Sequence, residues 1–346
     1  MIIEPPECEP ADNGVGAPLE NKGRLRRLFA SGVLLVAAAP ASGADAPYPT
    51  KVVRLIVPFA AGGSTDLFSR TVAQLMNDAW KQPVIVENRA GGGAIPGTMV
   101  AVKSPADGYT LLIGTVSTHA VNPALHPKLP YDALKDFTPI SELSYIAQLL
   151  SVHPSLPAKS VRELVALATN RPGEINYASG GVGATPHMSM ELFQLVSKTR
   201  MTRINYRGSG PAMIGMLTGE AQVMFDAAVT TLPHMRSGRL RTLAITTLKR
   251  SALVPDIPTV AESGYPGFET LVWFGMFAPA GTPPDIVRRI QETVASGLTS
   301  PSMRDQLTVQ GFDIVASTPP EFAKRIAREI EKWRGVVQAN NIKVDF

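Results

Sequence analysis

Three glycine-rich loops hold the residues of this sequence that are best suited to bind an anion. They are 58–66 (PFAAGGSTD), 179–187 (SGGVGATPH) and 206–210 (YRGSG). Each lies between a predicted strand and a predicted helix. Backbone N–H groups and the positive end of a helix dipole converge at such a junction, and glycines let the backbone approach a ligand closely. One such loop alone is more often a simple turn, but several together indicate a carboxylate or phosphate site.

Of four charged or titratable side chains near these loops, three have two interpretations each. Asp66 either faces a ligand that bears an amine or hydroxyl, or complements the dipole of the helix that it opens. Asp226, at the end of a predicted strand, either contacts the ligand or caps the next segment. Arg207 either pairs with a ligand carboxylate or forms a surface salt bridge. His187, in the first turn of a helix, is a weaker candidate for ligand binding.

Short β-branched runs alternate with helical segments from residue 51 onward. Strands are predicted at 52–57, 84–87, 110–114, 175–178, 202–206, 223–225 and 240–246. The predicted helices include 66–80, 98–103, 283–299 and 320–338. Capping boxes are predicted for Ser160 with Glu163, Thr282 with Asp285 and Thr318 with Glu321. This alternation is typical of an α/β fold in which parallel strands are joined by crossover helices.

Two extended apolar segments, 145–153 and 271–277, interrupt the alternation, and each leads into a proline. We interpret them as paired crossings between two lobes, the first running out and the second returning. Lobe I would then combine residues 48–150 with residues 272–346. Lobe II would comprise residues 151–271.

The amino-terminal segment has the three parts of a secretory signal peptide. A basic run at 22–27 precedes an apolar run at 28–39, and small residues follow up to Ala44. The apolar run is shorter than the ~20 residues needed to span a bilayer. We therefore expect residues 1–44 to be an extension and signal peptide, with cleavage after Ala44 and export to the periplasm.

The composition disfavours several other classes of protein. The 346 residues are 45% hydrophobic, 18% charged and 6% aromatic, with a net charge of +4, which is ordinary for a globular chain of about two domains. Such a weak positive charge, without a Lys/Arg block, does not indicate nucleic-acid binding. The single cysteine, Cys8, lies upstream of the predicted cleavage site, so the mature chain has no disulfide and no cysteine metal ligand.

Motifs of common enzyme classes are absent from the sequence. There is no Gly-x-Ser-x-Gly elbow, no Walker loop and no His-Glu-x-x-His helix. The glycines at 91, 93 and 97 resemble a dinucleotide-binding loop only superficially, because they follow the second predicted strand and lack a ribose-binding acid. We therefore expect no catalytic residues, no cofactor and no bound metal.

An ordered set of motifs resembles the Bug family, the extracytoplasmic substrate receptors of tripartite tricarboxylate transporters. The set covers the chain from about residue 48 to its end. Two segments depart from the family pattern. In the first loop, Ala60-Ala61 replaces a more proline-rich version, and the segment 144–151 is more often rich in valine and proline in the family. The matching segments are 57–66 (VPFAAGGSTD), 87–93 (ENRAGGG), 104–112 (SPADGYTLL), 128–137 (KLPYDALKDF), 177–179 (YAS), 206–212 (YRGSGPA), 223–226 (VMFD), 257–264 (IPTVAESG) and 273–283 (WFGMFAPAGTP).

The resemblance implies a two-lobed type II periplasmic-binding-protein fold, each lobe a mostly parallel sheet flanked by helices. It further implies that the chain is a monomeric binding protein and not an enzyme. Its partners would be a small carboxylate ligand and the membrane permease subunits of a tripartite transporter. A ligand-presenting partner of a membrane sensor and an exported hydrolase remain as alternatives. Carried over by position, the ligand-binding residues are Phe59, Ala60, Gly62, Ser64, Asp66, Thr115 and Ser117 in lobe I and Ser179, Gly183, Thr185, His187, Ser209 and Asp226 in lobe II.

Overall fold

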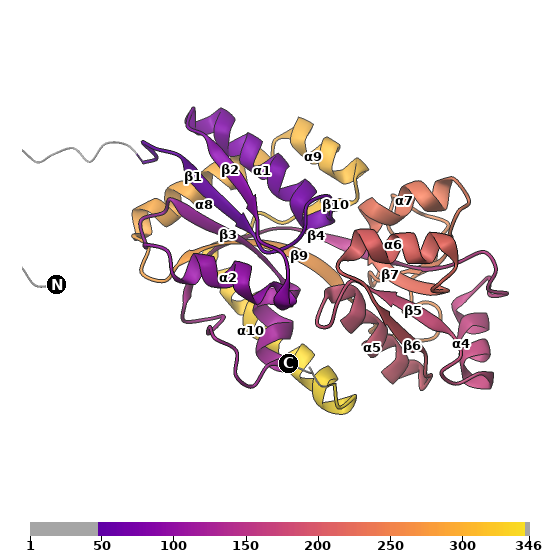
Figure 1. The fold of residues 1–346 in the computed structure, drawn as a ribbon. Coiled ribbons are helices and arrows are strands. Elements are labelled where there is room, and N and C mark those ends of the chain that lie inside the picture. The colour runs from indigo at the N-terminus through magenta and orange to yellow at the C-terminus, as the bar shows by residue number, and fades with distance from the viewer. Residues whose placement is uncertain (1–47, 343–346) are drawn as a thin grey trace, which may run out of the picture. The chain divides into compact units, whose positions relative to one another are not determined.

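The computed structural model describes residues 48–342. The predicted signal peptide, its cleavage site and Cys8 lie outside the described residues. Within residues 48–342, no helix is long and apolar enough to cross a membrane. Figure 1 shows these residues as two groups of strands and helices joined by long strands.

The first group is built around three parallel strands, as the alternation predicted. Strand β1 (Val53–Val57) pairs in parallel with both β2 (Val84–Asn88) and β3 (Thr110–Thr115). Helices α1 (Ser64–Trp80) and α2 (Ile95–Val102) connect them, with a short 3-10 turn η1 (Gly92–Ala94) before α2. The carboxyl ends of the three strands therefore lie at the same edge of the sheet.

The second group repeats this arrangement. Strand β5 (Asn176–Ser179) pairs in parallel with β6 (Thr202–Asn205) and, through Tyr177 and Val223, with β7 (Val223–Ala227). The connecting helices are α5 (Thr185–Ser197) and α6 (Ser209–Thr218). The remaining elements of this group are α4 (Val161–Asn170), α7 (Ala228–Arg236) and β8 (Arg241–Ile245).

Two long strands lie at the junction of the groups and include most of the two extended apolar segments. Strand β4 (Phe137–Val152) runs antiparallel to β9 (Leu271–Pro279) up to the pair Ala147 and Leu271. From Gln148 onward β4 pairs instead with β7 and β8. The partners of β4 thus change close to the predicted lobe boundary. The division at residues 150 and 272 stays a prediction, and the names lobe I and lobe II are kept for it below.

The sheets are mixed, since antiparallel pairs accompany the expected parallel ones. Every antiparallel pairing among the described strands includes β4 or β9, because one crossing strand leaves lobe I and the other re-enters it. Strand β10 (Phe312–Ile314) extends the first sheet by pairing with β4. The sequence did not predict β10 or the helix before it, α9 (Pro301–Val309).

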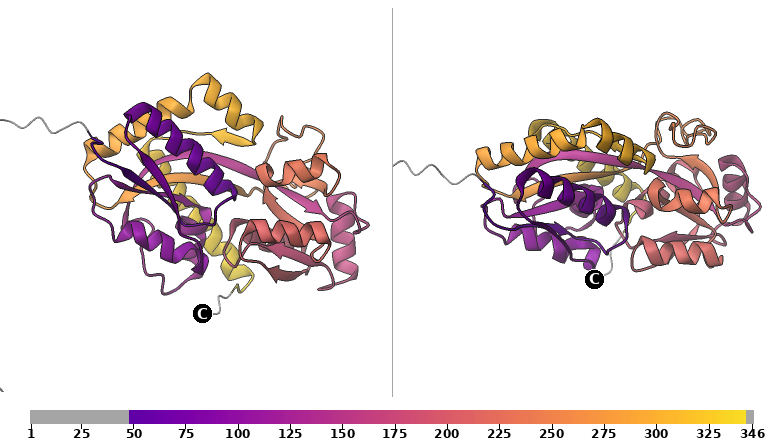
Figure 2. Two further views of the ribbon diagram at one scale, coloured as in Figure 1. Left: turned by 45° about the horizontal axis from the view of Figure 1, so that its top comes forward. Right: turned by 90° about the horizontal axis from the view of Figure 1, so that it is seen from above.

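Helices cover both faces of the first sheet (Figure 2). On one face, α1 and α8 (Pro284–Leu298) pack on Leu55 and Val57. On the other face, α2 and α10 (Pro319–Ala339) pack on Ile56. Alternate residues of β1 thus face opposite sides, as the period of a strand requires. Because both faces of β1 are covered, four of its five residues are buried and apolar, and Arg54, the exception, pairs with Glu87 of β2.

Of the three predicted capping boxes, one is complete, one forms only in half because Glu163 accepts the Lys159 N–H, and one is wrong. Thr318 and Glu321 form a complete capping box at the start of α10. At α4, Ser160 Oγ accepts the Glu163 N–H at 3.2 Å. The box predicted for Thr282 and Asp285 is wrong, because Pro283 is the N-cap of α8 and the Thr282 hydroxyl donates to the Pro279 carbonyl at 2.8 Å.

Candidate ligand-binding site

The three predicted loops lie at the carboxyl edges of the two parallel strand sets. Loop 1 (58–63) follows β1, loop 2 (180–184) follows β5 and loop 3 (206–208) follows β6. Thr115 ends β3, and Asp226 lies next to the end of β7. Open α/β sheets bind ligands at the carboxyl ends of their strands. Each lobe thus offers one such edge.

The helices that follow the three loops begin without a capping side chain. The N-cap residues of α1, α5 and α6 are Gly63, Ala184 and Gly208, and none of them has a side chain that accepts a hydrogen bond. The first N–H groups of an α-helix have no partner within the helix. The starts of α2, α7, α8 and α9 also have no capping side chain, whereas Ser160 and Thr318 cap α4 and α10. What distinguishes α1, α5 and α6 is that each follows a glycine-rich loop at a carboxyl edge of a parallel strand set.

Asp66 orders loop 1 from within. Its Oδ2 accepts the Gly62 N–H at 2.9 Å, and its Oδ1 accepts from Asn88 Nδ2 at 3.0 Å. Arg70 also donates to Oδ2, at 3.1 Å. Burial opposes ionisation of this carboxyl, but hydrogen bonds from Arg70, Gly62 and Asn88 hold its pKa below the usual value. The geometry therefore favours the interpretation in which Asp66 organises the start of α1.

The other candidate residues of loop 1 lie around these hydrogen bonds of Asp66. Gly62 has φ +83°, a conformation that favours glycine. Phe59 is half-buried, and its carbonyl accepts from Asn88 Nδ2 at 3.1 Å. Ala60 is exposed, and Ser64, the first residue of α1, is half-buried. Asn88 was not among the predicted site residues, although it lies within the motif at 87–93.

Thr115 has a buried hydroxyl without a partner. Its side chain is 1% exposed, and no hydrogen-bond partner for Oγ1 exists among residues 48–342. Thr115 lies directly opposite Phe274, so both side chains are on the same face of the sheet. Phe274 contacts Phe68 of α1, with 5.1 Å between ring centroids. The free hydroxyl thus lies on the face that α1 covers. Because an unpaired buried hydroxyl is costly, Thr115 is a candidate to hydrogen-bond a ligand.

Loops 2 and 3 lie against one another. A Cβ added to Gly180 would come within 3.0 Å of the backbone of Gly208 and Ser209. The Ser179 hydroxyl donates to the Gly181 carbonyl at 3.0 Å and accepts its N–H at 3.3 Å, so it holds loop 2 together. A side chain at position 180 would therefore crowd the backbone of loop 3.

Loop 2 also reaches lobe I. Gly183 has φ +77°, and a Cβ there would meet Leu125 at 3.2 Å and Asn122 at 3.6 Å. Both belong to α3 (Asn122–Leu125), which follows the π-helical turn η2 (Ser117–Val121). In that turn, Ser117 Oγ lies 3.3 Å from Thr185 Oγ1. The loop therefore contacts both lobes.

His187 is completely buried, and other side chains enclose it. Its Nδ1 accepts the Gly183 N–H at 3.2 Å. Its Nε2 lies 2.6 Å from Arg203 Nη1 and 3.4 Å from Glu191 Oε1. Burial lowers its pKa. The ring thus supports loop 2 from behind, in a way that the sequence did not reveal.

Asp226 lies beneath loop 3 and is 3% exposed. The Thr230 hydroxyl donates to its Oδ2 at 2.6 Å, and Ser209 also bonds to the carboxyl. Burial raises its pKa to about 6, against the effect of these hydrogen bonds. Asp226 therefore ties the start of α6 to the start of α7. Arg207 in the same loop is exposed.

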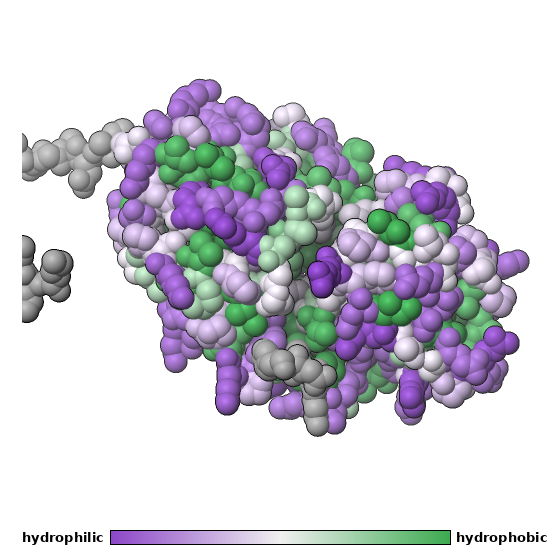
Figure 3. Space-filling model, viewed as in Figure 1, coloured by the Kyte–Doolittle hydropathy of each residue, from purple (hydrophilic) through white to green (hydrophobic). Residues whose placement is uncertain are grey.

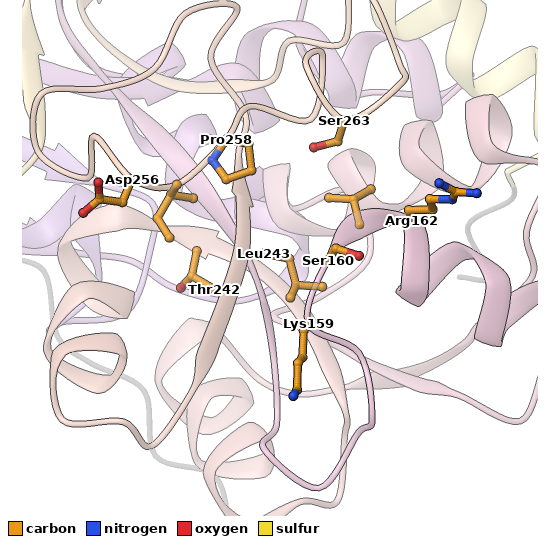
Figure 4. Close-up of a pocket in the computed structure, with 10 residues that line it drawn as sticks. Lys159, Ser160, Arg162, Thr242, Leu243, Asp256, Pro258 and Ser263 are labelled. Carbon is orange, nitrogen blue, oxygen red and sulfur yellow. The ribbon is translucent and has the colours of Figure 1, made fainter.

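Two surface pockets lie away from these loops. One, of about 340 Å³, is in lobe II and is lined by Lys159, Arg162 and Asp256 among others (Figure 4). The other, of about 330 Å³, lies by the starts of α8 and α10.

Residues 48–342 contain no group of three or more His, Cys, Asp or Glu side chains that could hold a metal ion. In Figure 3, hydrophobic residues form small separate patches among hydrophilic ones on the visible face.

Known proteins share this sequence and fold. A family model described as the tripartite tricarboxylate transporter family receptor matches residues 68–342. Protein BugT of Bordetella pertussis is 38% identical over 321 residues, which cover 92% of this chain and 98% of BugT.

Two solved structures show the same fold with ligands named in their descriptions. R. palustris Rpa4515 with adipate has a TM-score of 0.82 and 36% identity, covering 86% of this chain and 99% of that one. MatC (Rpa3494) from Rhodopseudomonas palustris with bound malate has a TM-score of 0.79 and 33% identity, covering 84% and 100%. The expected two-lobed type II binding-protein fold is thereby confirmed, and the chain belongs to the tripartite tricarboxylate transporter receptor family.

Proposed function

We propose that this chain is a periplasmic receptor that binds a small dicarboxylate between its two lobes and delivers it to the membrane permease subunits of a tripartite transporter. It catalyses no reaction. The observation that carries the proposal is the set of three helices, α1, α5 and α6, that begin without a capping side chain at the loops of both lobes. A carboxylate suits such helix starts because it accepts several N–H bonds and complements the dipole.

The arrangement favours a ligand with two separated acidic groups. Lobe I would hold one carboxylate with the first turn of α1 and the free hydroxyl of Thr115. Lobe II would hold the other with the starts of α5 and α6, which lie side by side through Gly180 and Gly208. The relatives named with adipate and malate support a dicarboxylate of four to six carbons.

The predicted ligand-binding residues divide into two roles in this proposal. Thr115, Ser117 and Thr185 supply hydroxyls. Ser209 supplies a backbone N–H at the start of α6, and Phe59, Ala60, Gly62, Ser64 and Gly183 shape the loops or present backbone N–H groups. The other four hold the loops in place: Asp66, Ser179, His187 and Asp226 make hydrogen bonds inside their own lobe.

A thermal-shift screen tests the proposed binding. The panel contains malate, succinate, glutarate, adipate and citrate, with the monocarboxylates acetate and butyrate as matched controls and with amino acids. A ligand at 100 times its Kd adds about 2.7 kcal/mol to the free energy of unfolding, which raises the Tm by several degrees for a protein of this size. We expect the largest shift from a dicarboxylate. Shifts from amino acids alone, or equal shifts from the monocarboxylates, would contradict the proposal.

Delivery to a permease needs a separate experiment. The exported protein, loaded with the best dicarboxylate, is used to capture partners from detergent-solubilised membranes of its own host. We expect integral membrane subunits of a transporter among the captured proteins, and fewer of them without ligand. Capture of a sensor ectodomain in their place would replace the transport proposal with a signalling one. Product formation from a carboxylic ester panel would overturn the non-enzymatic assignment.

A further inference from the structure

The carboxyl-terminal end of α10 joins lobe I to lobe II. Asn340, the C-cap residue of α10, donates from Nδ2 to the Glu191 carbonyl at 2.8 Å and lies 3.5 Å from Glu191 Oε2. Helix α10 packs on η2, α3 and β4, so its body belongs to lobe I. Glu191 lies in the middle of α5 of lobe II. Figures 1 and 2 show the yellow end of α10 running toward α5.

Glu191 is held by residues from three elements of lobe II. Its Oε1 accepts from the Tyr177 hydroxyl of β5 at 2.7 Å and lies 3.4 Å from His187 Nε2. Arg203 of β6 supplies a positive charge beside it. These contacts fix the side chain of Glu191 and thereby orient the imidazole of His187.

The imidazole transmits this orientation to loop 2. His187 Nδ1 accepts the N–H of Gly183, which faces Leu125 and Asn122 of lobe I. A continuous series of contacts therefore runs from Asn340 through Glu191 and His187 to the loop that we assign to the ligand. None of these side chains needs to touch the ligand.

We propose that Asn340 and Glu191 form an interlobe latch that holds the two lobes together and, through His187, keeps loop 2 in its binding conformation. The effect on ligand release rests on the proposed function, whereas the effect on the lobes does not. Asn340 and Glu191 are positioning residues in this scheme.

The first test measures the distance between the lobes without any ligand. Spin labels on Ala166→Cys of α4 and Ser296→Cys of α8, both exposed positions, report that distance in a Cys8→Ser chain. We expect Asn340→Ala and the isosteric Asn340→Asp to shift the distance distribution from that of the parent, because both lose the donor. The matched control is Gln338→Ala, at an exposed position two residues earlier on the same helix end. Distributions in both Asn340 variants identical to that of the control would overturn the latch.

The second test uses adipate and malate as probes of release. We expect Asn340→Ala to raise the dissociation rate about three- to tenfold with little change in the association rate. The reason is that the variant loses one hydrogen bond, which forms only when the lobes meet. Glu191→Gln keeps the backbone acceptor for Asn340. It should therefore raise the dissociation rate while leaving the interlobe distance unchanged.

The two tests separate the latch from the proposed function. If neither probe binds the parent protein, the proposed ligand class fails, and the distance measurement alone decides whether the latch exists. If the probes bind but Asn340→Ala changes neither the distance nor the dissociation rate, the latch is wrong and the receptor function stands. An increase in association rate without a change in dissociation would likewise contradict it.

Discussion

Ser117 Oγ and Thr185 Oγ1 lie 3.3 Å apart although they come from different lobes. Ser117 opens the turn after β3, and Thr185 is the first residue of α5. Ala184 is the N-cap of α5, and the Thr185 hydroxyl is directed to lobe I. The pair therefore lies where a ligand between the lobes would reach hydroxyls of both.

This pair predicts a coupling that a double-mutant cycle can measure. Thr185→Ala and Ser117→Ala should each weaken dicarboxylate binding, with an interaction energy of about 0.5–1.5 kcal/mol between them. Ser197→Ala, at the far end of α5, is the control and should leave the affinity unchanged. Titration calorimetry on the four members of the cycle provides the energies. Strictly additive losses would mean that the two hydroxyls act independently.

Asp226 predicts a stability change between pH 4 and 6. Its pKa is raised to about 6 in the folded protein, compared with about 3.9 for an unfolded chain. The folded state thus binds the proton more strongly, so stability from this group falls as pH rises through that window and stays low above it. The full effect is about 3 kcal/mol.

Asp226→Asn should remove this dependence. The difference in free energy of unfolding between variant and parent then shifts in favour of the variant as pH rises from 4 to 7. Urea unfolding at four pH values measures it. If the difference in free energy of unfolding between Asp226→Asn and the parent is the same at every pH, Asp226 is not the group responsible. Asp256→Asn, in an exposed loop, is the control.

The carboxyl group of Asp66 in loop 1 should give stability the opposite dependence on pH. Because its pKa is lowered in the folded protein, the carboxylate stabilises the fold above its unfolded pKa of about 3.9, and this contribution is lost as pH falls through the folded value. Asp66→Ala should free the Gly62 N–H and the Asn88 amide, which loosens loop 1 and weakens dicarboxylate binding. Calorimetry compares it with Asp78→Ala, an exposed position on the same helix. Equal affinity in the two variants would contradict this role of Asp66.

Most of the fold could be predicted because its signals are local. The β-branched runs at β1, β3 and β7 and the long apolar segments at β4 and β9 lie within single stretches of sequence. Strand β10 could not be found in this way, since it has three residues and only Phe312 is buried. It exists because β4 offers an edge to it, which is a tertiary effect.

The positions of the site loops could also be predicted, but the roles of their side chains could not. Glycines at strand–helix junctions mark loops 1 to 3 directly. That Asp66 bonds to Asn88, 22 residues away, depends on β1 and β2 being neighbours. His187 and Glu191 are four residues apart on α5, so helical spacing alone brings them together. The contact of His187 with Arg203 of β6 depends on tertiary structure, and nothing in the sequence pointed to it.

Gly97 gives the final prediction, because it explains a glycine that motif analysis left without a role. A Cβ at this position would lie 2.5 Å from the Arg89 carbonyl and 2.8 Å from Pro58 Cα, at the start of loop 1. Gly97→Ala should therefore push α2 away from loop 1, with a stability loss of about 1–3 kcal/mol, as is usual for overpacking, and a weaker affinity for dicarboxylates. Gly335→Ala on α10, where an added Cβ meets nothing, is the matched control and should gain stability slightly from helix propensity. Urea unfolding and calorimetry on both variants decide the matter: if Gly97→Ala is as stable and binds as tightly as Gly335→Ala, then the close approach of α2 to Pro58 does not shape the site.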